Sequence, residues 1–370
     1  MINVAYVAVA PFISGSERCL QLILTHCQTV DISPILITPH SSPMKQWAKD
    51  NNIIHYSCDL SPFSIKSSLR WLLTQFKFYK ILKKNKINVI HSNQIWSYQV
   101  IAPIAQLLKI KRVCHFRDPI NSGSKWWLKE PLTVAICISK HIRAEYEAIF
   151  SKGHAKKVTT LIDPVSFHPP LLAAERKAYK IIAKQKMNID EKLFTFAFIG
   201  QIAPIKGLLE LIVFLAKLPN KDWQLIVAGK DPSIEQTYIN LCTDKVAELK
   251  LEKHVKFIGF VDDTRDFYHA VDIITMFSIE EPLGLIPLEA AVHYTPTIAT
   301  NVGGLPETII DGKTGWLVDV NNEADVIEKL TSAMSANLFD YGTAARTWVE
   351  SVSLPEVHCQ ALKKLYIDNL

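Results

Sequence analysis

The sequence predicts an α/β protein of two domains, each built on a parallel sheet covered by helices. Its 370 residues suit two domains that each bury a core of their own. Short apolar runs alternate with helical patterns throughout, which is typical of parallel strands joined by crossover helices. Residues 1–163 hold 21 Lys and Arg against 9 Asp and Glu, a balance of +12, and the remainder has a balance of −7. Halves of opposite charge favour two domains and direct an anionic partner to the first.

The predicted strands fall into two sets, and a glycine or a polar residue follows most of them, as in turns at the carboxyl ends of strands. The first set is Asn3–Ala10, Ile35–Thr38, Ile53–Tyr56, Val89–Ser92, Arg112–Phe116, Thr133–Ile138 and Val158–Ile162. The second set is Phe194–Ile199, Trp223–Ala228, Val255–Phe257, Ile273–Met276, Thr297–Ala299 and Gly315–Val318. Ligands of such folds bind beyond the carboxyl ends of the strands, where the strand order reverses.

The predicted boundary between the domains lies near residues 163–170, where Asp-Pro and Pro-Pro break regular structure. We expect a first domain at 1–165, a linker and basic helix at 166–192, a second domain at 193–350 and a helix at 351–370.

Cysteine usage and hydropathy indicate the compartment. The seven cysteines are scattered and form no Cys-x-x-Cys pair, which suits a reducing cytosol and argues against a disulfide framework or a zinc site. The N-terminus lacks the basic first region of a signal peptide. No run approaches the ~20 apolar residues that cross a bilayer. We therefore expect a cytoplasmic protein, soluble or attached to a membrane surface.

The stretch 278–315 carries most of the functional information. Glu281 and Glu289 stand eight apart, with Gly284 between them at the start of an apolar helical pattern. The first amides of such a helix and its positive dipole end attract phosphate. Flanking carboxylates repel phosphate but accept hydrogen bonds from hydroxyls. This combination suits a sugar, a diphosphate and a ribose in one molecule, which is a nucleotide sugar.

This stretch resembles the second half of the retaining glycosyltransferases of the GT4 family, also called glycosyl transferases group 1. The family signature is Glu, seven residues and Glu, with a Gly after the first acid and a later Gly-Gly-x-Pro-Glu loop. The residues that match in order and spacing are Glu281, Gly284, Glu289, Gly303, Gly304, Pro306 and Glu307. The resemblance implies the GT-B fold, two Rossmann-like domains facing across a cleft, with the last helix crossing back to the first domain.

The resemblance also implies residue roles. Glu281 would hold hydroxyls of the donor sugar and Glu289 the ribose, while the amides at Gly284 and Leu285 would stabilise the departing diphosphate. Backbone groups after Gly259, at Phe260, would hold the base edge. The family's transfer needs no metal, no cofactor and no protein nucleophile, because the leaving diphosphate assists the incoming hydroxyl.

A second motif follows the first strand of the second domain. The family has Gly-Arg, a short loop and Lys-Gly here, with Arg and Lys clamping the diphosphate. This chain keeps Lys206 but has Gln201 in the place of Arg, and a neutral amide cannot balance phosphate charge. Either another cation supplies the charge, with Lys230 and Arg117 as candidates, or the donor binds more weakly.

Two first-domain features remain open between function and structure. The loop containing Gly15 could bring backbone to the donor phosphate or the acceptor, or it could be a helix start capped by Ser14 or Ser16. His115 ends a predicted strand, and the resemblance implies a contact between this His and the transferred sugar. A lone His at a strand end also occurs as a purely structural residue.

Residues 66–86 contain seven basic residues, several aromatic ones and no acid. A helix of this composition can lie on anionic lipid, with Trp126 and Trp127 as an additional interfacial anchor. The alternative is a solvated basic helix face. Nothing resembles a nucleic-acid-binding module, so we expect no nucleic acid partner.

The predicted function is that of an enzyme, a glycosyltransferase. It would use a nucleotide-diphosphate donor and a glycan or lipid-linked acceptor, in bacterial surface polysaccharide or lipopolysaccharide biosynthesis by analogy. It would work in the cytoplasm or on the inner face of the plasma membrane. One alternative is a donor-binding partner without turnover, which Gln201 keeps open. Another alternative is a nucleotide-sugar epimerase of the same fold, which would need acid and base groups on both sides of the sugar, and the Glu-x7-Glu pattern argues against it. A Rossmann dehydrogenase is disfavoured because no predicted strand is followed by Gly-x-Gly-x-x-Gly.

Overall fold

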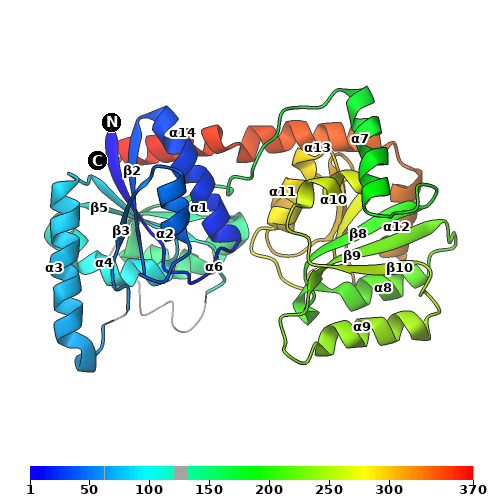
Figure 1. Ribbon diagram of the computed structural model, residues 1–370, viewed down its shortest axis with the longest axis horizontal. Coiled ribbons are helices and arrows are strands. Elements are labelled where there is room, and N and C mark those ends of the chain that lie inside the picture. The colour runs from blue at the N-terminus through cyan, green and yellow to red at the C-terminus, as the bar shows by residue number, and fades with distance from the viewer. Residues whose placement is uncertain (62, 121–131, 370) are drawn as a thin grey trace. The chain divides into compact units, whose positions relative to one another are not determined.

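The computed structural model describes residues 1–61, 63–120 and 132–369. It divides into two compact units (Figure 1): Met1–Ser166 together with Val352–Leu370, and Phe167–Ser351. Each unit has one sheet in which every pairing is parallel, so the predicted α/β class with two parallel-sheet domains is confirmed.

The sheet of the first unit has seven strands in the order β3-β2-β1-β4-β5-β6-β7. They are β1 (Ile2–Val7), β2 (Ile32–Thr38), β3 (Ile54–Ser57), β4 (Val89–Ser92), β5 (Lys111–Phe116), β6 (Leu132–Cys137) and β7 (Ala155–Thr160). The helices are α1 (Gly15–His26), α2 (Met44–Asp50), α3 (Ser68–Lys84), α4 (Ile95–Leu107), α6 (Lys140–Ile149) and α14 (Pro355–Ile367). Single turns lie at Cys27–Val30, Ile65–Ser67 and Phe150–His154.

Alternation along β1 gives this unit a core on each face of its sheet, because successive strand residues point to opposite faces. Val4 and Tyr6 pack with α1, α2 and α14, whereas Ala5 and Val7 pack with α3 and α4. The helix α14 enters the first of these cores through Cys359, Leu362 and Tyr366.

The sheet of the second unit has six strands in the order β10-β9-β8-β11-β12-β13. They are β8 (Phe194–Gln201), β9 (Trp223–Lys230), β10 (Val255–Gly259), β11 (Ile273–Met276), β12 (Thr297–Thr300) and β13 (Gly315–Val318). The helices are α7 (Ala173–Lys186), α8 (Leu208–Ala216), α9 (Thr237–Glu248), α10 (Thr264–Ala270), α11 (Leu285–Val292), α12 (Glu323–Ser335) and α13 (Leu338–Ser353). Single turns lie at Pro204–Lys206 and Leu305–Glu307.

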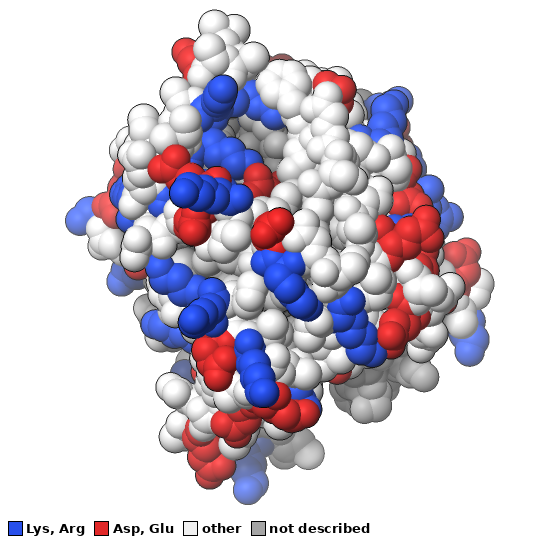
Figure 2. All heavy atoms as spheres, turned by 90° about the vertical axis from the view of Figure 1, so that its right-hand side faces the viewer, with Lys and Arg blue, Asp and Glu red and all other residues white. Residues whose placement is uncertain are grey.

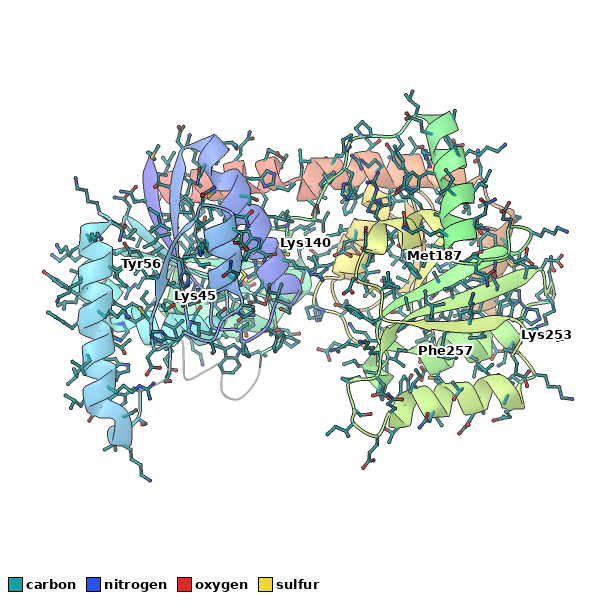
Figure 3. The ribbon with its side chains drawn as sticks, in the orientation of Figure 1. Lys45, Tyr56, Lys140, Met187, Lys253 and Phe257 are labelled. Carbon is teal, nitrogen blue, oxygen red and sulfur yellow. The ribbon has the colours of Figure 1, made fainter. Side chains whose placement is uncertain are left out.

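Helices cover both faces of this sheet as well. One core contains side chains of α8, α9 and α12, and the other contains side chains of α7, α10 and α11. Phe257 packs against the first core and Met187 against the second (Figure 3). The basic helix expected as part of a linker is α7, which lies in the second unit and contributes Ala183 to its core.

One face of the second unit carries basic and acidic side chains beside one another (Figure 2). Within the three described ranges, none of the helices has the length and apolar content to pass through a bilayer.

Candidate functional site

The strand order of the second unit reverses between β8 and β11, so the carboxyl ends of these strands are where a ligand is expected. The turn after β8 carries Lys206, and the loop after β11 leads through Glu281 into α11. The two motifs found far apart in the sequence therefore meet at one edge of one sheet.

Lys206 and Glu281 form a direct ion pair, with 2.6 Å between Nζ and Oε2. The side chains are 26% and 12% exposed, so a ligand can reach both. Gly207 places the lysine turn here, since a Cβ on it would lie 1.9 Å from the carbonyl oxygen of Phe277. The structure thus brings together the two residues predicted to hold phosphate and sugar.

The helix α11 begins at Leu285, with Gly284 as its N-cap in a left-handed conformation (φ 92°). Its first amides have no partner within the helix, and Pro287 contributes none. The predicted helix start is observed, with amides at Gly284 and Leu285 next to the loop that carries Glu281.

The Gly-Gly loop packs directly against the loop of the first acid. A Cβ on Gly303 would lie 2.1 Å from the carbonyl oxygen of Glu281, and one on Gly304 would lie 2.4 Å from that of Pro282. The Gly304 amide donates to the Glu281 carbonyl oxygen at 2.8 Å. The glycine pair therefore fixes the backbone of Glu281, a role that sequence reasoning missed because it depends on contact between distant loops.

The second acid, Glu289, lies on α11 and is half-buried. It accepts a hydrogen bond of 2.7 Å from the hydroxyl of Tyr268 on α10. Sequence reasoning did not find Tyr268, because only the packing of α10 beside α11 brings it to the acid. The hydrogen bond orients the carboxylate of Glu289.

Gln201 and Lys230 are register partners at the ends of β8 and β9, and both are exposed. The Lys230 ammonium lies 4.9 Å from the ring centroid of Phe260, which is 54% exposed. A second cation thus stands beside the neutral residue at position 201, and the predicted base contact lies next to it.

The first-domain candidates lie in the other unit. Gly15 is the first residue of α1, where the Ser14 amide donates to Glu17 Oε2 at 3.3 Å and the Ser14 hydroxyl lies 2.5 Å from the same oxygen. The capping alternative is therefore present in the structure, and the predicted contact with phosphate or acceptor stays a prediction.

His115 lies in a buried polar cluster. Its side chain has no solvent exposure, and its Nδ1 atom lies 3.0 Å from His91 Nε2 and 3.4 Å from Arg117 Nη2. Burial, followed by the charge of Arg117, lowers the pKa of His115 well below its ordinary value of 6.5. A contact between His115 and a sugar would require this cluster to open, so that role also stays a prediction.

Arg117 does not present a free charge. It donates to both oxygens of Asp163, at 2.7 and 2.9 Å, and is 8% exposed. Of the two cations considered as substitutes for an arginine at 201, only Lys230 lies in the unit that contains Gln201.

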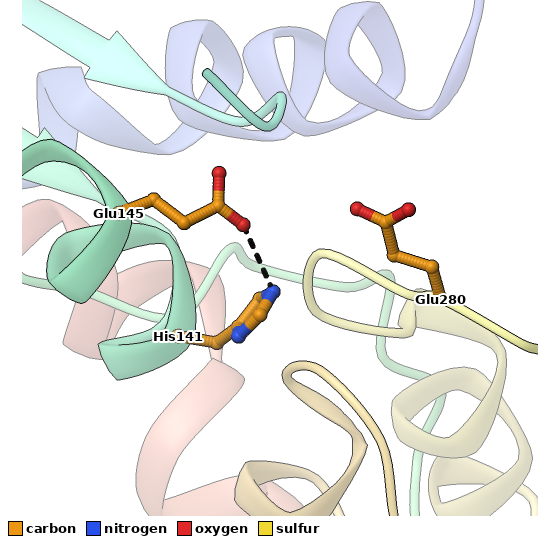
Figure 4. A group of neighbouring side chains, drawn as sticks. All are labelled: His141, Glu145 and Glu280. Carbon is orange, nitrogen blue, oxygen red and sulfur yellow. Dashed lines mark ion pairs between the residues drawn. The ribbon is translucent and has the colours of Figure 1, made fainter.

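Surface pairs of the first unit include His141 and Glu145 on α6, 3.1 Å apart (Figure 4). Trp126 and Trp127 lie outside the described residues.

Comparison with known proteins relates the second unit to a described family. Residues 180–347 match the family model described as glycosyl transferases group 1. A D-inositol 3-phosphate glycosyltransferase of Corynebacterium efficiens is 35% identical over 151 residues, which cover 38% of this chain and 35% of that protein. The chain thus spans about a third of the length of the curated relatives it matches first.

Solved structures extend the likeness to the whole chain. A glycosyltransferase from Rickettsia africae has a TM-score of 0.83 at 20% identity, covering 100% of this chain and 98% of that one. Anabaena HepE in complex with UDP and glucose has a TM-score of 0.81 at 18% identity, with 100% of both chains covered. Identities this low show the fold, which is GT-B. The similarity in sequence to the glycosyl transferases group 1 family thus falls on the second unit, over residues 180–347.

Proposed function

We propose that this chain is a retaining glycosyltransferase that moves a sugar from a nucleotide-diphosphate donor to an acceptor hydroxyl. The Lys206–Glu281 pair beside the start of α11 is the observation that carries the proposal. It combines a cation and helix amides, which suit a diphosphate, with a carboxylate that accepts from sugar hydroxyls.

Donor binding would divide this pair between two parts of the ligand. The Lys206 ammonium moves from Glu281 to an oxygen of the diphosphate, and the released carboxylate accepts from hydroxyls of the sugar. Glu289, held by Tyr268, accepts from the ribose hydroxyls. The backbone at Phe260 would meet the base edge.

The reaction itself needs positioning and charge stabilisation more than covalent chemistry. The acceptor hydroxyl forms the new bond to the anomeric carbon on the face from which the diphosphate departs. Its proton passes to a phosphate oxygen, and the bond between carbon and phosphate oxygen breaks. Lys206 and the amides at Gly284 and Leu285 balance the charge that grows on the diphosphate, so the mechanism uses no metal and no cofactor.

The proposed acceptor is a glycan or lipid-linked precursor of a bacterial surface polysaccharide or lipopolysaccharide, reached from the cytoplasm at the inner face of the plasma membrane. The basic segment of the first unit supports the membrane setting. The name of the Corynebacterium relative supports a soluble acceptor as the competing case, because that name contains inositol 3-phosphate.

A donor screen by thermal unfolding tests the proposal. The UDP-, GDP-, ADP- and dTDP-sugars are added separately, because a ligand that binds the folded state raises the midpoint by mass action. We expect the largest rise with a UDP-sugar, the donor class suggested by the UDP and glucose bound to Anabaena HepE. Stabilisation by none of the donors would contradict the proposal.

Turnover separates the proposal from a donor-binding protein without activity, which Gln201 favours. The preferred donor is incubated with a bacterial glycolipid extract and with inositol 3-phosphate, and products are followed by mass spectrometry. Retention is read from the anomeric proton in NMR. Stabilisation by a donor without transfer or donor hydrolysis would favour the binding protein.

A further inference from the structure

The helix α3 has apolar side chains on both of its faces. Its inner face packs into the first unit through Phe78, Ile81 and Leu82. Its outer face exposes Leu69, Leu72, Leu73 and Phe76, which are 56% to 71% exposed, and the preceding turn adds Ile65 at 87%. Four large apolar residues exposed on two turns of one helix form a patch that soluble surfaces seldom keep.

The outer face follows helical spacing and changes character along its length. Residues 69, 72, 76, 80 and 83 recur three or four apart, so they form one stripe. The first half of the stripe is apolar and the second half is Lys80 and Lys83, with Lys84 beside them. The Lys80 ammonium lies 4.5 Å from the Phe76 ring centroid, where the two halves meet. Figure 3 shows side chains on the side of α3 that is turned away from the sheet, besides those that point toward it.

We infer that the outer face of α3 docks on an anionic lipid surface, with Leu69, Leu72 and Phe76 inserted and Lys80, Lys83 and Lys84 held among the headgroups. This deepens the proposed function, on which it rests, by naming the segment that brings the enzyme to a lipid-linked acceptor. Helices on a bilayer surface combine apolar residues with Lys in this way. Interfaces with proteins are instead depleted in Lys, which argues for lipid as the partner.

Charge complementarity sets the lipid class. Residues 66–86 contain no acid, so no part of the segment repels an anionic headgroup. Two of its cations are engaged elsewhere, since Arg70 pairs with Asp59 and Lys77 donates to the Ser57 carbonyl oxygen. The lysines at 80, 83 and 84 continue the apolar stripe and supply the attraction.

Sedimentation with vesicles tests the inference. The full chain is mixed with phosphatidylglycerol–phosphatidylcholine vesicles or with pure phosphatidylcholine, at 0.1 M and 1 M salt. We expect binding to the anionic vesicles at low salt and weaker, residual binding at 1 M, because salt shortens the Debye length from ~10 to ~3 Å and leaves apolar insertion unscreened.

Two triple variants separate the components. Leu69→Ser/Leu72→Ser/Phe76→Ser should lower partitioning at least about tenfold and should abolish the vesicle binding that remains at 1 M salt. Lys80→Glu/Lys83→Glu/Lys84→Glu should lower partitioning at least about a hundredfold at 0.1 M, since each lost cation costs about fivefold and the new carboxylates add repulsion. Ile234→Ser is the control for a lost apolar side chain, because Ile234 is fully exposed in the second unit and residues 231–240 contain no Lys or Arg.

Three results would overturn the inference: no binding to anionic vesicles at 0.1 M, unchanged binding of the serine variant, or a dimer of the wild type that the serine variant cannot form. The last would assign the face to a second copy of the chain. Stabilisation by the nucleotide sugar is measured on every variant. A wild type that binds the donor but not the anionic vesicles contradicts only the lipid-docking face. A wild type that binds no donor contradicts the proposed function.

Discussion

Replacing Lys230 by alanine should weaken nucleotide-diphosphate binding, although position 230 lies outside the family's signature residues. Register partners on neighbouring parallel strands lie about 4.8 Å apart and project to the same face of the sheet. Gln201 and Lys230 are such partners, at strand ends beside the Lys206 turn. We therefore expect Lys230 to supply the charge that an arginine at position 201 would bring.

The magnitude follows from the exposure of the site. A hydrogen bond to a charged group contributes about 1.5–3 kcal/mol, and solvent screening at an exposed pair reduces this toward about 1 kcal/mol. We expect Lys230→Ala to raise the Kd for UDP about five- to tenfold. Gln201→Arg should tighten binding by about 1 kcal/mol and should recover most of the loss when both changes are combined, because either cation can then face the diphosphate.

Isothermal titration of UDP into the wild type, both single variants and the double variant gives the coupling between the two positions. Lys253→Ala is the matched control, because Lys253 precedes β10 and so lies at the amino ends of the strands (Figure 3). Unchanged affinity in Lys230→Ala would refute the reasoning. If Lys230→Ala weakens UDP binding equally with glutamine and with arginine at position 201, the two positions act independently.

Glu281→Ala should reduce turnover severely, while bare UDP should bind as well as before or better, because the change removes the carboxylate that occupies Lys206. Glu289→Ala should weaken the binding of UDP itself. Equal loss of UDP affinity in both variants would contradict this division of roles. Gly303→Ala should destabilise the second unit on the order of 2–3 kcal/mol, since its Cβ would meet the Glu281 carbonyl oxygen at 2.1 Å. Gly312 is also left-handed, but a Cβ on it would have no neighbouring atom within 4 Å. Gly312→Ala should therefore lower the free energy of unfolding in urea by only about 1 kcal/mol. Burial lowers the pKa of His293 to about 3 from an ordinary 6.5. As pH falls, the unfolded chain therefore protonates His293 before the folded chain does. The free energy of unfolding declines between pH 6.5 and 3 by at most about 1.4 kcal/mol per pH unit. His293→Gln should make this decline shallower, as measured by urea unfolding at pH 7 and pH 5.

The sequence alone predicted the strands of both sheets and the main motif. Buried parallel strands appear as short apolar runs between helical patterns, and the structure has a strand at each predicted position. The turn with Lys206 and the start of α11 were also expected, because each depends on a glycine or a helix end that the local sequence marks.

Contacts between segments far apart in the chain could not be predicted from the sequence. The sequence marks Asp163 only as part of an Asp-Pro break, yet the folded chain places its carboxylate on Arg117. The Lys206–Glu281 pair and the Gly303 contact depend likewise on how loops after two strands meet. For α3, composition showed the charge, but only the packing of Phe78 inside the core showed which apolar residues stay outside.

The packing of α14 also bears on the order in which the chain folds. The hydroxyl of Tyr366 lies 3.2 Å from that of Tyr6 and 2.5 Å from Nδ1 of His91, in the interior of the first unit. During synthesis this unit waits for residues that leave the ribosome after residues 167–351, whereas the second unit is contiguous and can fold as soon as it emerges. Until α14 is synthesised, the apolar surface formed by Leu20, Leu24 and their neighbours lacks this cover, so we expect the nascent first unit to be the more aggregation-prone part of the chain.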